Sequence, residues 1–312
     1  MCRFVLYQGV PLTIASLVTE PANSIINQSV HSKESEEPLN GDGFGVAWWA
    51  PELSHKPAVF RSVTPAWSNM NLLELARVTR SGCILAHVRA ATRGIPVTEL
   101  NCHPFAAGPY AFMHNGDVAR FGAIRRRVLA ELSDDSFHAV KGSTDSEHLF
   151  GVFLDEVAKA GGTPAATTSG KAKATPAHQS NAMATALERT VSYIAELSRN
   201  AVRARVKRDD ATPEEDEDCY LNIAASDGEH SVACRYTTAS IEPSSLYVHT
   251  GRRYVCEGGL CRMVSPEKGH GAVIVSSEPL SDDPGWQKIP KNHMVVVGQD
   301  RTCEIRPMNV TR

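Results

Sequence analysis

The apolar positions in the first third of the chain form short runs that predict β-strands. Each run is bounded by Gly, Pro, Asn or Asp, which end strands. The run 83–88 is largely apolar, so we expect its sheet to be covered on both faces. Gly9 and Pro11 are expected to end the first strand, and Asn115-Gly116 to form a turn after the last. The strands predicted here are 3–7, 46–49, 59–61, 83–88 and 111–114.

Apolar residues at helical spacing lie between and after these strands. Residues 12–30 predict a mixture of helix and loop, and residues 31–38 a polar surface loop. One helix is expected to run to about residue 160. Ser143 or Thr144 suits its N-cap, and Glu147, three residues after Thr144, fits a capping box. The other predicted helices are 70–79, 121–132 and 181–204.

From Cys219 onward the pattern returns to short strands, with Asp227-Gly228 as a clear hairpin signal. Strands, then helices, then strands are typical of a layered α+β domain with two packed sheets and helices outside. No clear linker or internal repeat interrupts the chain. We therefore predict one domain over 2–312, with a low-complexity loop at 161–180 and a charged loop at 205–218. The later strands are predicted at 220–226, 231–236, 245–249, 272–276, 293–298 and 302–306.

Composition excludes some classes of function. The chain has 312 residues, of which 42% are hydrophobic and 21% charged, as in ordinary globular proteins. Its formal net charge of -3 argues against binding to nucleic acid or to an anionic membrane. No apolar run approaches the ~20 residues of a transmembrane helix. Arg3 and Gln8 interrupt the only candidate for a signal peptide, so a cytoplasmic protein is expected.

The eight cysteines show no CxxC pair and no dense framework, so we expect reduced thiols. Cys256 and Cys261 have four residues between them and no paired ligands nearby, which does not favour a zinc site. A second group of possible metal ligands consists of His87, Cys102, His103 and His114. These residues lack the HxH or HExxH spacing of metal ligands, so structural roles are favoured and no metal or cofactor is predicted.

Cys2 is notable because it directly follows the initiator methionine. Methionine aminopeptidase removes Met1 when the next side chain is small, and Cys2 would then carry a free α-amine. That amine titrates near pH ~8 and the thiol near ~8.5, so one residue can supply both base and nucleophile. The alternative is that Cys2 is an ordinary small apolar residue on the first strand.

Three further polar positions lie at predicted strand ends or at a helix start: Arg89, Asn115-Gly116 and Asp145. Each alone has a structural explanation, namely an ion pair, a turn, or a charge favourable at a helix N-terminus. Together they suit attack of a thiolate on a γ-carboxamide. Asn115 and the Gly116 N–H can stabilise the oxyanion. Arg89 can bind the α-carboxylate of a glutamyl group, and Asp145 its ammonium group.

These motifs resemble class II glutamine amidotransferase domains in order and approximate spacing. They are Met1-Cys2, His87-x-Arg89-x-x-Thr92, His114-Asn115-Gly116 and Thr144-Asp145-x-Glu147. The resemblance implies the N-terminal-nucleophile fold, a four-layer αββα sandwich. It further implies Cys2 as nucleophile with its α-amine as base, and Asn115 and Gly116 as the oxyanion hole. Arg89 and Asp145 would clamp the glutamyl group, with Thr92 assisting.

Other segments resemble the amidotransferase-like subunits of fungal glutathione-degrading complexes. The resemblance implies a small-molecule γ-glutamyl substrate, glutathione or glutamine, and a peptidase-like partner subunit. Ala90 and Arg93 differ from the aromatic residue and the histidine common in the synthases, so the substrate side of the pocket is expected to differ. The segments that carry this resemblance are 1–4, 24–29, 40–47, 64–67, 101–105, 142–147 and 276–280.

The leading interpretation is an enzyme that hydrolyses γ-glutamyl amide bonds, acting in glutathione degradation with a partner subunit. One alternative is a glutaminase that delivers ammonia from glutamine to a partner enzyme. A second alternative is a non-catalytic interaction subunit that keeps the fold.

The mechanism predicts that any residue left ahead of Cys2 abolishes activity, because the amine becomes an amide and cannot act as a base. Glutamate release should be compared between the processed protein and one with an uncleavable N-terminal tag. Full activity of the tagged protein would contradict the mechanism.

Overall fold

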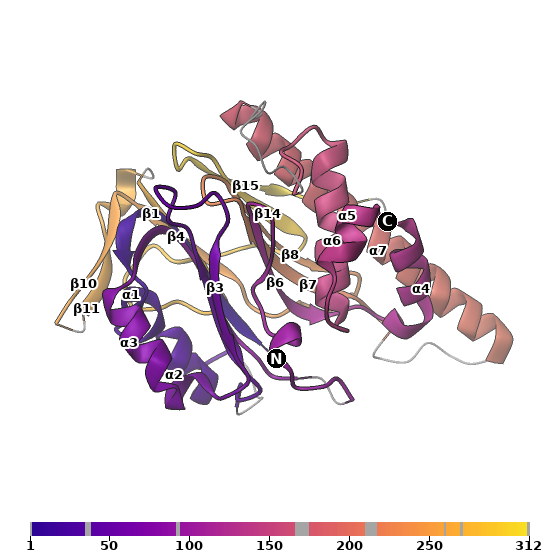
Figure 1. The fold of residues 1–312 in the computed structure, drawn as a ribbon, viewed down its shortest axis with the longest axis horizontal. Coiled ribbons are helices and arrows are strands. Elements are labelled where there is room, and N and C mark those ends of the chain that lie inside the picture. The colour runs from indigo at the N-terminus through magenta and orange to yellow at the C-terminus, as the bar shows by residue number, and fades with distance from the viewer. Residues whose placement is uncertain are drawn as a thin grey trace.

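The computed structural model describes residues 2–34, 39–91, 94–165, 175–209, 217–258, 260–268 and 271–310. Two antiparallel sheets face each other at its centre, and helices cover the outer face of each (Figure 1). The site described below lies where strands of both sheets end.

The first sheet has seven strands in the order β13-β9-β12-β1-β4-β2-β3. Strand β1 lies between β12 and β4, and its register places Arg3 opposite Val88 of β4. The first residues of the chain therefore lie beside the end of β4. The strands are β1 (Arg3–Thr13), β2 (Phe44–Trp48), β3 (Ala58–Ser62), β4 (Arg80–Val88), β9 (Tyr247–Gly251), β12 (Ala272–Ser276) and β13 (Gln287–Lys288).

The second sheet has six strands in the order β15-β14-β8-β7-β6-β5. The pairing of β6 with β7 places Asn115 opposite Asn222. The strands are β5 (Phe105–Ala107), β6 (Tyr110–Asp117), β7 (Tyr220–Ser226), β8 (Ser231–Thr237), β14 (His293–Val297) and β15 (Cys303–Pro307).

The helices form the two outer layers. The first sheet is covered by α1 (Ala15–Val18), α2 (Ile25–Val30) and α3 (Met70–Val78), together with a hairpin of β10 (Arg253–Glu257) and β11 (Leu260–Val264). The second sheet is covered by α4 (Phe121–Glu131), α5 (Asp134–Ala139), α6 (Asp145–Lys159) and α7 (Pro176–Asp209). Short 3-10 helices occupy Ala66–Ser68, Glu99–Asn101 and Pro266–Lys268.

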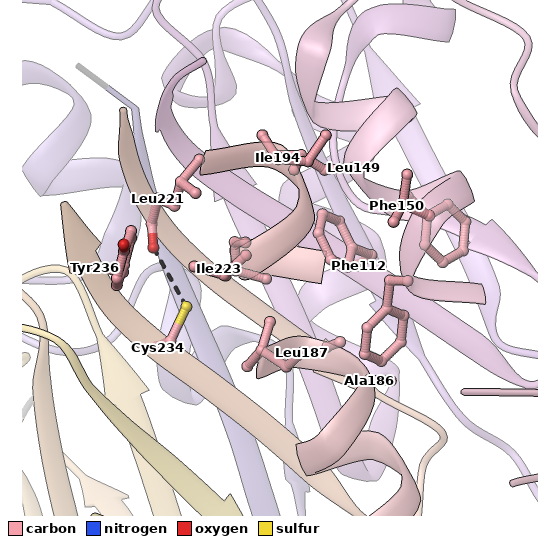
Figure 2. Close-up of a cluster of buried hydrophobic side chains, with 14 of the residues drawn as sticks. Phe112, Leu149, Phe150, Ala186, Leu187, Ile194, Leu221, Ile223, Cys234 and Tyr236 are labelled. Carbon is pink, nitrogen blue, oxygen red and sulfur yellow. Dashed lines mark hydrogen bonds between the residues drawn. The ribbon is translucent and has the colours of Figure 1, made fainter. Parts of the chain in front are cut away.

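Three apolar cores separate these four layers. Along β1, Phe4 and Leu6 enter the core between the sheets, while Val5 and Tyr7 face the α1–α3 layer. This alternation follows from the two-residue period of a strand. On the far side, Phe112 of β6 packs against Phe150 of α6 in the largest core (Figure 2). The four-layer αββα sandwich expected from the resemblance is confirmed.

The prediction that Gly9 and Pro11 end the first strand is wrong, because β1 continues to Thr13. The pairing with β4 shifts register between Gln8 and Leu12. A bulge leaves extra residues unpaired, so Pro11 costs no ladder hydrogen bond there. The sequence signal marked the bulge rather than the end of the strand.

The predicted turn at Asn115-Gly116 is also wrong, since both residues lie within β6 and pair with β7. Gly116 has φ +155°, and a Cβ at this position would lie 1.7 Å from the Tyr220 carbonyl oxygen. The glycine therefore allows close approach of the neighbouring strand and does not make a turn.

Helix α7 is longer than the predicted helix 181–204. The Thr175 hydroxyl accepts from the His178 N–H at 3.4 Å, and Pro176 occupies the first helical position, which proline favours. Residues 176–180 and 205–209, assigned above to the two loops, are consequently helical. Residues 166–174 and 210–216 of those loops lie outside the described residues.

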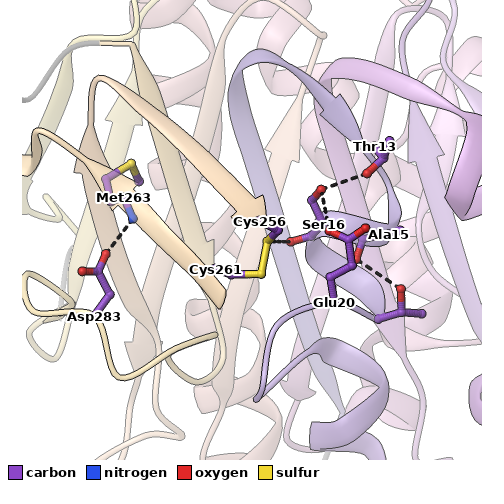
Figure 3. The surroundings of a disulfide bond; sticks show 9 residues. Thr13, Ala15, Ser16, Glu20, Cys256, Cys261, Met263 and Asp283 are labelled. Carbon is purple, nitrogen blue, oxygen red and sulfur yellow. Dashed lines mark hydrogen bonds between the residues drawn. A yellow bond between two sulfur atoms is a disulfide. The ribbon is translucent and has the colours of Figure 1, made fainter. Parts of the chain in front are cut away.

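Cys256 and Cys261 form a disulfide, so the expectation of reduced thiols is wrong for this pair (Figure 3). They lie directly opposite each other in the β10–β11 hairpin, which the sequence pattern did not predict. The hairpin packs beside α1 and the segment that ends at Glu20. The other six cysteines are free thiols.

Within the described ranges, no helix is both long enough and apolar enough to cross a bilayer.

Reducing the Cys256–Cys261 disulfide should lower the free energy of unfolding by about 2 kcal/mol, because the loop it closes in the unfolded chain is short. Denaturant unfolding with and without reductant would measure the difference. The double variant Cys256→Ser/Cys261→Ser should not respond to reductant. Equal stability of the oxidised and reduced wild-type protein would contradict the expectation.

Candidate active site

Cys2 lies half-buried at the start of β1, next to the segment that leaves β4. Its Sγ is 3.5 Å from the Ala90 carbonyl oxygen. Burial raises the pKa of the Cys2 thiol, while the positive charges of Arg89 and Arg3 act in the opposite direction. A thiol whose pKa is raised needs a base before it can attack.

Arg89 directly follows β4 and is 3% exposed. The loop before β2 holds its backbone: Arg89 N–H donates to Gly43 O at 2.8 Å, and Asp42 N–H donates to Arg89 O at 3.0 Å. The Asp42 carboxylate also accepts from Ala91 N–H at 2.8 Å. Among the described residues, the buried Arg89 Nη1 has no hydrogen-bond partner. A buried guanidinium with a spare donor is suited to receive a carboxylate.

Asn115 is held by the β6–β7 pairing and is 2% exposed. Neither its side-chain nitrogen nor its side-chain oxygen has a partner in the part of the chain that is described. Buried amides are normally satisfied, so this one calls for an explanation. An oxyanion that accepts from Asn115 Nδ2 would provide one.

Asp145 opens α6, and Thr144 is the N-cap as predicted, accepting from Glu147 N–H at 3.2 Å. The Asp145 carboxylate accepts from Val118 N–H at 2.9 Å and from Ser146 N–H at 2.7 Å. These bonds tie the helix to the chain that leaves β6. The second half of the capping box is absent, because Glu147 accepts instead from Lys141 N–H and Gly142 N–H.

Hydrogen bonds between the layers bring these groups to the same end of the sandwich. His87 Nε2 of β4 is 3.3 Å from the His114 carbonyl oxygen of β6, which links the two sheets. His114 Nδ1 is in turn 2.9 Å from Ser146 Oγ of α6. The three predicted site residues lie next to these linked residues in the sequence. Arg89 is two positions after His87, Asn115 directly follows His114, and Asp145 directly precedes Ser146. Thr92 lies outside the described residues.

Residues 20–190 match the family model of class-II glutamine amidotransferases. The chain belongs to this family.

Two individual proteins match almost the whole chain. The chain is 37% identical to a probable glutamine amidotransferase, DUG3, of Saccharomyces cerevisiae, over 99% of this chain and 84% of that protein. It is 28% identical to the gamma-glutamyl-hercynylcysteine sulfoxide hydrolase of Mycolicibacterium smegmatis, over 99% of this chain and 100% of that protein.

Solved structures agree with this assignment. A glutamine aminotransferase class-II domain protein from Silicibacter pomeroyi matches with a TM-score of 0.61 and 27% identity, over 98% of this chain and 99% of that one. The glutamine phosphoribosylpyrophosphate amidotransferase of B. subtilis matches with a TM-score of 0.52 and 12% identity, over 100% of this chain and 50% of that one. The second likeness concerns the fold alone. The resemblance and fold class inferred from the sequence are confirmed.

The structure adds residues to which the sequence had assigned no role. Asn101 Oδ1 accepts from Ser143 N–H at 3.0 Å, and Asn101 Nδ2 donates to Pro96 O at 2.9 Å. Asn101 thereby fixes the loop that precedes Asp145. Asn101 and Asp42 both belong to segments that carried the family resemblance. That membership was the only feature of the sequence that could have indicated a role for them at the site.

The buried histidines stack rather than converge as metal ligands. The rings of His87 and His103 are 4.2 Å apart, and that of Phe105 is 4.5 Å from His103. Burial lowers the pKa of His87 to about 3, and burial with nearby positive charge holds the pKa of His103 well below its usual value. Both rings are therefore neutral at pH 7.

These neutral histidines predict a loss of stability in acid. Their folded pKa values lie below the ~6.5 of an unfolded histidine, so their contribution is present above pH ~6.5 and is lost as the pH falls, for His87 down to about pH 3. Between its folded and unfolded pKa values, each histidine should add up to about 1.4 kcal/mol per pH unit to the slope of the unfolding free energy. Denaturant unfolding at several pH values measures the slope. The variant His87→Phe should show a shallower slope, and an unchanged slope would argue against a neutral His87.

Proposed function

We propose that the protein hydrolyses γ-glutamyl amide bonds, with glutathione as its substrate and a peptidase-like subunit as its partner. The proposal rests on one arrangement of side chains. Cys2 lies half-buried at the end of the sandwich where Arg89 and Asn115 also lie, and both of these residues have buried polar atoms without partners among the described residues. The names of the relatives support it, since one is a hydrolase of a γ-glutamyl compound and another a probable glutamine amidotransferase.

In the proposed reaction, removal of Met1 frees the α-amine of Cys2. That amine takes the thiol proton as sulfur attacks the γ-carbonyl carbon, and the carbonyl oxygen becomes an oxyanion. Asn115 Nδ2 and Gly116 N–H stabilise this oxyanion. The protonated amine then gives its proton to the leaving nitrogen, the C–N bond breaks, and a thioester remains.

Water resolves the thioester in the second half of the reaction. The α-amine takes a proton from the water, hydroxide adds to the thioester carbon, and the same oxyanion contacts are used again. The C–S bond then breaks, the thiolate recovers its proton, and glutamate leaves.

The glutamyl group is held by charge in this proposal. Arg89 Nη1, buried and without a partner among the described residues, binds the α-carboxylate. The Asp145 oxygens each accept one or two hydrogen bonds already and retain lone pairs for the ammonium group. Thr92 is proposed to assist the carboxylate contact.

We also propose a cytoplasmic location, one domain over 2–312, and a reaction that needs no metal or cofactor. Six free cysteines, including the nucleophile, suit a reducing compartment. The redox state of that compartment would then decide whether the Cys256–Cys261 pair is oxidised.

A glutaminase that feeds ammonia to a partner enzyme is the second candidate, favoured by the family and by the DUG3 relative. It uses the same chemistry on glutamine. A non-catalytic subunit is less well supported, because it would have no use for the buried groups of Arg89 and Asn115 that lack partners in the described chain.

The deciding experiment compares glutamate release from glutathione and from glutamine at equal concentration. The protein should be isolated from its own cells under mild conditions with its partners retained, and Cys2→Ala serves as the blank. We expect glutathione to be preferred. A preference for glutamine would favour the glutaminase, and release equal to the Cys2→Ala blank from both compounds would overturn the enzymatic proposal.

A further inference from the structure

Arg3, the residue after the proposed nucleophile, is 2% exposed, and each of its three guanidinium nitrogens donates a hydrogen bond. Its Nη1 donates to the Cys2 carbonyl oxygen at 2.8 Å. Its Nε donates to the Glu278 carboxylate at 3.2 Å, and its Nη2 donates to Ser32 Oγ at 2.7 Å. One side chain therefore joins the backbone of Cys2 to a buried carboxylate.

Glu278 is fully buried and has donors on both oxygens. Besides Arg3, it accepts from Ser32 Oγ at 2.5 Å, from Lys33 N–H at 3.0 Å and from Asn23 Nδ2 at 3.4 Å. A carboxylate with this many donors remains ionised, so the buried Arg3–Glu278 pair is charged, and both Glu278 oxygens accept hydrogen bonds.

The chain beside Glu278 is fixed to the same strand. Ser277 N–H donates to Phe4 O at 3.0 Å, and Phe4 N–H donates to Ser277 Oγ at 3.0 Å. These bonds continue the pairing of β1 with β12 beyond Ser276. Glu278 is thus held level with the first residues of β1, where it can restrain them.

We propose that the Arg3–Glu278 pair is a positioning device for the N-terminal nucleophile: Arg3 fixes the Cys2 carbonyl and so orients the thiol and α-amine of Cys2 towards the substrate. The inference rests on the proposed function. Once Met1 is removed, Cys2 has no preceding residue, and chain ends fray unless they are tied down. The carbonyl is the one backbone group of Cys2 that neighbouring side chains can hold without occupying the reacting amine.

Burial of a charged pair supports a positioning role over a purely stabilising one. Desolvation offsets most of the attraction between buried charges, and apolar residues often give equal or greater stability. The benefit of such a pair is fixed geometry. Arginine suits it because its planar fork serves Glu278, Ser32 and the Cys2 carbonyl together, whereas the single ammonium of lysine cannot.

The test uses Arg3→Lys with Arg235→Lys as its matched control. Arg235 is also 2% exposed and paired with a glutamate, Glu242 at 2.7 Å, but its other acceptors are the carbonyls of residues 243, 244 and 289 and not that of Cys2. All proteins should be released by a protease that leaves Cys2 as the first residue, with mass spectrometry to verify the N-terminus. Full chains with their partners retained should be used.

We expect Arg3→Lys to lower kcat about 10–100-fold with KM nearly unchanged, because a displacement of about 1 Å costs rate while the glutamyl contacts remain. Arg235→Lys should lower Tm without changing kcat per folded molecule. Glu278→Gln, which keeps the size of the side chain but removes its charge, should act in the same direction as Arg3→Lys. It also serves as the second variant if Arg3→Lys does not fold.

A second readout does not depend on turnover. A loosened N-terminus should expose Cys2, so its alkylation by iodoacetamide should become faster in Arg3→Lys, while the buried thiols Cys83 and Cys234 keep their wild-type rates. A structural defect alone would speed alkylation of all three. Wild-type kcat together with a wild-type Cys2 alkylation rate in Arg3→Lys would overturn the proposal, as would identical changes in Arg235→Lys.

The two proposals fail in different ways. If the wild-type protein releases no more glutamate than Cys2→Ala from glutathione or glutamine, the proposed function fails. The alkylation rates still decide whether Arg3 and Glu278 hold Cys2.

Discussion

The site depends on the hydrogen bonding of β1 along both of its edges. Cys2 directly precedes β1, so the bonds that fix β1 also restrain the proposed nucleophile. The pairing of Val5 with both Ser276 of β12 and Ala86 of β4 supplies that restraint from two sides. Phe4 and Leu6, both fully buried, anchor the same strand in the core between the sheets. If β1 were an edge strand, it would be hydrogen-bonded to one neighbouring strand only, and Cys2 would be restrained from one side.

The second requirement is that three layers meet at one end, and two histidines join them by hydrogen bonds. His87 contacts a carbonyl oxygen of β6, so its Nε2 must carry the proton and its Nδ1 must be an acceptor. That Nδ1 is buried with no partner among the described residues, an arrangement that a charged imidazolium would not tolerate. Burial of this ring is the main cause of the low pKa of His87, and the hydrogen bond to the His114 carbonyl oxygen acts in the opposite direction. Through His114 and Ser146 the join extends to α6.

Local sequence signals predicted those parts of the molecule whose causes are local. Thr144 caps α6 through a hydrogen bond that spans three residues, and the apolar run of β4 reflects burial on both faces. Turn signals failed where pairing between distant strands overrides them, as at Gly116 in β6. The sequence motifs identified Cys2, Arg89 and Asp145 as candidate site residues. Arg3 and Glu278 lie in segments 1–4 and 276–280, which carried the family resemblance, but no local signal pairs them, because 275 residues separate them in the sequence.

Buried polar groups at this end of the fold are of two kinds: some are hydrogen-bonded within the chain, and others have atoms without a partner in the described chain. This difference indicates the role of each group. Arg3 donates through Nε, Nη1 and Nη2, and both Glu278 oxygens accept hydrogen bonds, so these two groups hold the chain in place. Arg89 and Asn115 keep buried atoms without partners in the described chain, which costs about 1–3 kcal/mol for each group. Such a cost persists in a stable protein only if rigid surroundings prevent the groups from turning to water or to each other. The loop before β2 fixes the backbone of Arg89, and the β6–β7 ladder fixes that of Asn115. In the proposed reaction, this rigidity would keep the donors in place before a substrate binds, as electrostatic catalysis requires.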